Sequence, residues 1–136
     1  AVRSGTLFHV HAVPWRRDDF GEAIRRVAGQ DFRRLAADVD VFGPMAYHHI
    51  ASQPVAWING VVRDLVDLTG RPVWPCVQVR EAYDKPRLDL AEAEAAIREG
   101  MRPPSGGVVI FWWNELRDDP ERQALLRRLA GEGVVD

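Results

Sequence analysis

The residues best suited to chemistry follow an apolar segment near the C-terminus, where Trp112 and Trp113 are succeeded by Asn114 and Glu115. An indole offers a flat apolar surface on which a sugar ring can stack. Asn114 could hold a hydroxyl group, and Glu115 is the carboxylate best placed for acid–base work. Two consecutive tryptophans on a strand would lie on opposite faces. The alternative interpretation makes Glu115 and Asp118 ordinary loop acids that lead into a helix.

Two earlier apolar segments carry imidazole, indole and phenol groups at the same relative position. His9 and His11 are two residues apart, so on a strand they point together and could bind a metal or a polar ligand. Packed histidines bonded to the backbone are the alternative. Tyr47 could contact a ligand, or it could fill the core with its hydroxyl bonded to a neighbour. The further candidates for substrate contact at these positions are Trp15, His48 and His49.

A third apolar segment contains Cys76 and Gln78 and is followed by Glu81. A buried amide costs free energy unless it is fully hydrogen-bonded, which favours a binding role for Gln78. Cys76 is the only cysteine, and we interpret it as a small buried apolar residue, because a catalytic thiol needs a neighbouring base. Glu81 with Glu115 is the one pair of carboxylates that we nominate for catalysis.

These side chains are positioned by four short apolar segments at nearly even spacing, each bounded by Gly, Pro or Asp, as is typical of strands covered on both faces. We expect the strands at residues 6–13, 39–47, 72–79 and 107–113.

Helical patterns with start signals lie between and after the expected strands. Asp19 with Glu22 and Asp89 with Glu92 have the spacing of a capping box. The other expected boundaries are an N-cap at Asp31, first helical turns at Pro54 and Pro120, and a C-terminal stop at Gly70.

Strand–helix alternation at this period predicts an α/β protein made of four consecutive parallel β/α units. The 136 residues are expected to form a single domain. One assembly is a small open sheet with helices on both faces. The other is half of a (β/α)8 barrel, whose bare apolar inner face would need the missing N-terminal half, a second copy in a homodimer, or another protein.

The composition narrows the function classes. Net charge is −2, so we expect no nucleic-acid partner, and no apolar run is long enough to cross a membrane. No Gly-rich phosphate loop or other nucleotide motif is present, so we expect no cofactor. No signal segment opens the chain, and either an extracellular or a cytoplasmic location is compatible with the sequence.

The sequence resembles the C-terminal half, strands five to eight, of glycoside-hydrolase-like TIM barrels such as chitinase-like and related glycosidases. The segments that carry the resemblance are Phe8-His9-Val10-His11 running into Pro14-Trp15, Asp40 to His48 with Pro44, Met45 and Tyr47, Pro75 to Val79, and Gly107 to Trp113.

The resemblance implies an oligosaccharide or polysaccharide substrate, contacts to it from Tyr47, Gln78 and Trp113, and hydrolysis of glycosidic bonds as the parent activity. It also implies that the acid catalyst, at the end of the fourth strand, is missing from this chain, which we therefore expect to be inactive alone. The alternatives are a metal-dependent hydrolase using His9, His11 and a histidine of the second strand, and a non-catalytic small α/β domain.

Overall fold

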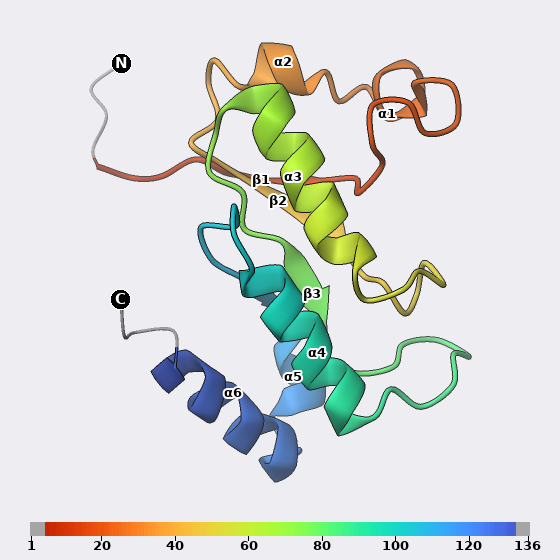
Figure 1. Cartoon of the computed structure of the whole chain (residues 1–136), viewed down its shortest axis with the longest axis vertical. Coiled ribbons are helices and arrows are strands. Elements are labelled where there is room, and N and C mark those ends of the chain that lie inside the picture. The colour runs from red at the N-terminus through yellow and green to blue at the C-terminus, as the bar shows by residue number, and fades with distance from the viewer. Residues whose placement is uncertain (1–4, 133–136) are drawn as a thin grey trace.

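The computed structural model describes residues 5–132, apart from the side chain of Glu115 (Figure 1). Four strands alternate with helices along the chain. In order, the elements are β1 (His9–Ala12), α1 (Ala23–Arg26), α2 (Phe32–Leu35), β2 (Val41–Ala46), α3 (Trp57–Thr69), β3 (Cys76–Gln78), α4 (Leu90–Met101), β4 (Val109–Phe111), α5 (Trp113–Leu116) and α6 (Pro120–Glu132).

The strands form one parallel sheet in the order β1-β2-β3-β4. His9 lies opposite Val41, Met45 opposite Cys76, and Val77 opposite Ile110. The predicted α/β class and the four parallel β/α units are therefore confirmed. Each strand is added beside the previous one, so no strand order reverses anywhere in this sheet.

The helices cover one face of the sheet. α3 contacts both α2 and α4, and α4 contacts α6, so these helices follow one another as the strands do (Figure 1). Two apolar cores fill the space beneath them. Phe42 belongs to the core under α2 and α3, and Val77 to the core under α3, α4 and α6. The expected alternative with helices on both faces is wrong, because crossovers of one hand between successive neighbours all pass on the same side.

Alternate strand residues point to the other face, and none of them belongs to either core. We call this surface the bare face. The bare face carries no Asp, Glu, Lys or Arg side chain. Its larger side chains shield the smaller ones, so Cys76 is buried while Met45 and Trp74 are partly exposed. The bare face comprises His9, His11, Val41, Gly43, Met45, Trp74, Cys76, Gln78, Val109 and Phe111.

The outer edge of β1 is bonded by a side chain rather than by another strand. The side-chain oxygen Oε1 of Gln30 accepts from the Val13 backbone N–H at 2.9 Å, and the side-chain nitrogen Nε2 of Gln30 donates to the His11 backbone carbonyl at 3.4 Å. Backbone groups on an exposed strand edge otherwise invite pairing with another chain. Gln30 therefore closes the carboxyl half of this edge.

Most predicted helix boundaries are confirmed. Asp89 and Asp31 accept hydrogen bonds from the backbone N–H groups of Glu92 and Arg34. α6 begins at Pro120, and Gly70 ends α3 in the left-handed conformation that glycine tolerates best.

Two helix starts were predicted wrongly. Asp19 does not cap α1, which begins at Ala23, because Phe20, Gly21 and Glu22 all have positive φ and form a turn. α3 begins at Trp57 and not at Pro54. In both places the loop after a strand is longer than the sequence pattern indicated.

The prediction that Trp112 and Trp113 continue a strand is also wrong. β4 ends at Phe111, Trp112 precedes α5, and Trp113 is the first residue of that helix. The two indoles are therefore not placed on opposite faces of the sheet by strand alternation. Trp113 is 65% exposed.

Candidate ligand-binding site at the carboxyl edge of the sheet

A cavity of about 520 Å³ lies between the loops that follow β1 and β2. Because the strands are parallel, these loops both leave from the carboxyl edge of the sheet, where ligands of α/β proteins usually bind. We call it the edge cavity. Its volume suits a small organic ligand. Its lining residues are Pro14, Trp15, Arg16, Asp19, Phe20, Ala51, Gln53 and Trp57.

Aromatic rings form much of the wall of the edge cavity. The rings of Trp15 and Phe20 meet edge to face at a centroid distance of 5.5 Å. Trp15 and Trp57 each pack partly against the apolar cores, which holds the two indoles in place. Asp19 accepts a hydrogen bond from Arg16 N–H at 2.8 Å and so shapes the first loop. Polar groups on rigid aromatic walls favour a ligand with both apolar and polar faces.

A second aromatic group lies at the ends of β2 and β4. Tyr47 stacks on Phe111 at 4.4 Å, and Phe111 meets Trp112 edge to face at 4.2 Å. The Tyr47 hydroxyl donates to Cys76 Sγ at 3.7 Å. Burial, then the bond to Cys76, raises the pKa of Tyr47 well above its usual range. Burial also raises the pKa of the Cys76 thiol, so Cys76 is a buried thiol as predicted and not an activated nucleophile.

Gln78 is fully buried, and both ends of its amide are bonded to backbone. Its oxygen accepts from Ile50 N–H at 3.1 Å, and its nitrogen donates to the Arg80 carbonyl at 2.7 Å. Gln78 therefore ties the loop after β2 to the loop after β3. This satisfies the amide without a ligand, which is a role that the sequence pattern could not distinguish from substrate contact.

His48 is 1% exposed and faces α4, whereas Tyr47 lies against Phe111 of β4. Its Nε2 lies 3.1 Å from Glu92 Oε1, so the neutral ring with its proton on Nε2 donates to that carboxylate. Burial lowers the pKa of His48, and the hydrogen bond and charge of Glu92 oppose the shift only in part. The nearby ring of His49 lies 6.3 Å away. His48 thus anchors the loop after β2 to α4.

His9 and His11 lie together on the bare face, with their rings stacked at 5.1 Å. Burial, then the neighbouring His11, lowers the pKa of His9. Nε2 of His9 is buried without a hydrogen-bond partner in the described structure. Within residues 5–132, His, Cys, Asp and Glu side chains nowhere gather in a group of three or more that could hold a metal ion.

Glu81 belongs to a network at the ends of β3 and β4. Its Oε2 accepts from Leu88 N–H at 3.1 Å. Burial raises its pKa, but the backbone N–H groups of Glu81 and Leu88 and the charges of Arg80 and Arg122 outweigh this, and the pKa lies below its usual range. A carboxylate held ionised in this way suits a base or a nucleophile better than a general acid.

Sequence reasoning missed Arg122, which is 5% exposed at the centre of this network. Its guanidinium donates to the Val79 carbonyl at 2.7 Å, to Asp119 Oδ2 at 2.8 Å and to the Leu88 carbonyl. The signal was present, because Asp119 precedes α6 and Arg122 follows it at the i+3 position. Asp119 also accepts from Arg80 at 3.2 Å.

The remaining predicted site residues lie in α5. Trp113 and Asn114 are exposed, and neither lines the edge cavity. The side chain of Glu115 is outside the described part of the chain. The nominated pair of Glu81 and Glu115 therefore stays a prediction.

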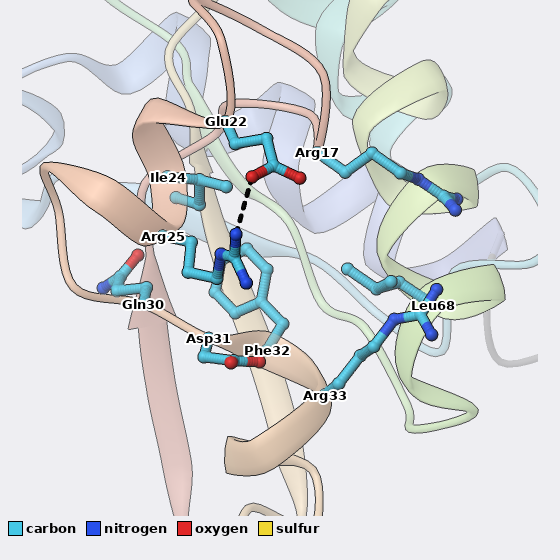
Figure 2. Close-up of a pocket in the computed structure, with 9 residues that line it drawn as sticks. All are labelled: Arg17, Glu22, Ile24, Arg25, Gln30, Asp31, Phe32, Arg33 and Leu68. Atoms are coloured by element: carbon cyan, nitrogen blue, oxygen red, sulfur yellow. Dashed lines mark hydrogen bonds and ion pairs between the residues drawn. The ribbon is translucent and has the colours of Figure 1, made fainter.

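Another cavity, of about 230 Å³, lies between α1, α2 and α3 (Figure 2). Ile24, Phe32 and Leu68 give it an apolar part. Two of its three arginines pair with acids, since Arg25 bonds Glu22 at 2.7 Å and Arg17 bonds Asp64 at 3.3 Å. It is smaller than the edge cavity and has no indole in its lining, so we regard the edge cavity as the stronger candidate.

Comparisons with protein families, with curated proteins and with solved structures find no match to this chain. Across residues 5–132, the helices are too short or too polar for any of them to cross a bilayer.

Proposed function

We propose that this chain is the carbohydrate-binding part of a glycoside-hydrolase-like (β/α)8 barrel, whose parent activity is hydrolysis of glycosidic bonds. The observation that carries the proposal is the edge cavity, where two indoles and Phe20 stand beside the polar side chains of Arg16 and Gln53. A sugar ring has apolar C–H faces and a rim of hydroxyl groups. Aromatic walls with neighbouring hydrogen-bonding side chains fit both.

The sheet supports the barrel part of the proposal. Four parallel strands in consecutive order, with helices on one face only, agree with what half of a barrel would require. The bare face, with Met45, Trp74 and Phe111 on it, then becomes the inner wall once a further four β/α units complete the barrel. Those units would also supply the general acid, for which Glu81 is unsuited by its lowered pKa.

Titration with neutral and acidic oligosaccharides, followed by tryptophan fluorescence and calorimetry, tests the sugar-binding part. We expect saturable binding that is weakened about tenfold by Phe20→Ala or Gln53→Ala, both at exposed cavity positions. Phe8→Ala is the matched control for Phe20→Ala, since Phe8 is also an exposed phenylalanine and does not line the cavity. Absence of binding across the panel by folded protein would contradict the proposal.

Sedimentation of the 136-residue chain tests the barrel part. An uncovered apolar sheet face should drive self-association or require the complementary half. A monodisperse, cooperatively folding monomer would support the alternative of a small self-sufficient α/β domain.

A further inference from the structure

The edge cavity contains a cation that has no acid partner among residues 5–132. Arg16 lines the cavity, and among the described residues no carboxylate forms an ion pair with its guanidinium. Its neighbour Arg17 differs, because Arg17 is paired with Asp64 at 3.3 Å. Arg16 therefore has the donors of a planar guanidinium available next to two indoles.

The acid in the lining of the cavity bonds to the backbone instead. Asp19 Oδ2 accepts from the backbone N–H of Arg16 at 2.8 Å, so this carboxylate stabilises the turn and not the guanidinium. Gln53, which also lines the cavity, is neutral.

The Arg16 side chain lies close to the first turn of α3, and the residue there is a glycine. A Cβ built on Gly60 would come within 2.6 Å of Arg16 Nη2. The guanidinium thus rests against the backbone of α3, beside Trp57 at the start of that helix. Without a Cβ at position 60, Arg16 can lie along the cavity wall.

From these contacts we infer that the edge cavity takes a sugar that carries a carboxylate, a uronate residue, with Arg16 as the group that binds the carboxylate. This inference rests on the proposed sugar-binding function and names its substrate class. A guanidinium and a carboxylate form charge-assisted, often bidentate hydrogen bonds. The indoles of Trp15 and Trp57 would hold the ring.

Matched pairs of ligands test the inference, with oligogalacturonate against galacto-oligosaccharide of equal length, and glucuronate-containing against glucose oligosaccharides. Calorimetry on the full chain should show about tenfold or tighter binding of the acidic member. Arg16→Gln should abolish this preference, and Arg17→Gln should leave it unchanged. Asp19→Asn keeps an acceptor for Arg16 N–H and removes a negative charge, so it should strengthen binding of the acidic member.

The outcomes distinguish failure of the uronate inference from failure of the proposed sugar-binding function. Equal affinity for the acidic and neutral members, or an acidic preference that survives Arg16→Gln, overturns the uronate inference and leaves sugar binding in place. If neither member of any pair binds to folded protein, the proposed function itself fails.

Discussion

The two halves of the carboxyl edge are built differently. The loops after β1 and β2 enclose a cavity with aromatic walls and a cation that has no acid partner in the described structure. The loops after β3 and β4 are held together by Arg122, whose guanidinium bonds two backbone carbonyls and Asp119. In the first half, the Arg16 guanidinium is available to a ligand. In the second half, the Arg122 guanidinium is fully engaged in hydrogen bonds within the protein. Function is therefore expected where hydrogen bonds are still available.

The largest effect should come from removing the buried guanidinium. Arg122→Met leaves the carbonyls of Val79 and Leu88 and the carboxylate of Asp119 without their donor, so unfolding free energy should fall by about 3 kcal/mol. Urea denaturation measures this. Arg127→Met is the control, because Arg127 is exposed on the same helix. A change below about 1 kcal/mol would mean that this half is not locked by Arg122.

A smaller loss is expected where the two halves are joined. Gln78→Met keeps the side-chain volume but leaves Ile50 N–H and the Arg80 carbonyl unbonded, at a cost of about 2 kcal/mol. Gln53→Met, at an exposed position, should be close to neutral in the same urea experiment. Equal effects of both variants would show that the Gln78 amide does not connect the loops.

The pH dependence of stability should report the anchor of the β2 loop. The pKa of His48 is lowered in the folded state, so the unfolded chain binds the proton more tightly and stability should fall as pH drops from about 7 to 5.5. The lowered pKa of Glu81 acts only at more acidic pH. His9, with its own lowered pKa, contributes in the same direction.

His48→Gln should reduce the slope of unfolding free energy against pH in this range, and His9→Gln serves as the comparison for the bare face. A slope that His48→Gln leaves unchanged would show that His48 is not held neutral by its surroundings.

The smallest effect on stability is expected within the edge cavity. Phe20 is 77% exposed, so Phe20→Ala should change unfolding free energy by no more than about 0.5 kcal/mol. The same variant should weaken sugar binding, and the two measurements together separate a binding residue from a packing residue. A loss of stability as large as that of Gln78→Met would place Phe20 among the packing residues.

The fold followed from the sequence because its signals are local. Apolar segments that recur along the chain, and caps such as Asp89, Asp31 and Gly70, depend on residues close together in the sequence. The structure confirms these three caps. The positive φ of Phe20 and Glu22 was not predictable in this way, since non-glycine residues adopt it only under the influence of their surroundings.

The site was harder to predict than the fold. The sequence indicated Trp15 but not Phe20, Gln53 or Trp57, which join it only because two loops meet in space. Gln78 was recognised as unusual, yet its partners, Ile50 N–H and the Arg80 carbonyl, are backbone groups that carry no sequence signal. The sequence pattern predicted that the Gln78 amide is buried. It could not predict which groups form hydrogen bonds with that amide.

The Gln30 amide on the outer edge of β1 has a consequence for any larger assembly. A strand that approaches this side must compete with a tethered side chain of the same protein, which occupies the His11 carbonyl and Val13 N–H. A strand that pairs with β1 on this side must therefore replace the two hydrogen bonds of the Gln30 side chain. In this way the Gln30 side chain disfavours edge-to-edge association of separate chains at β1.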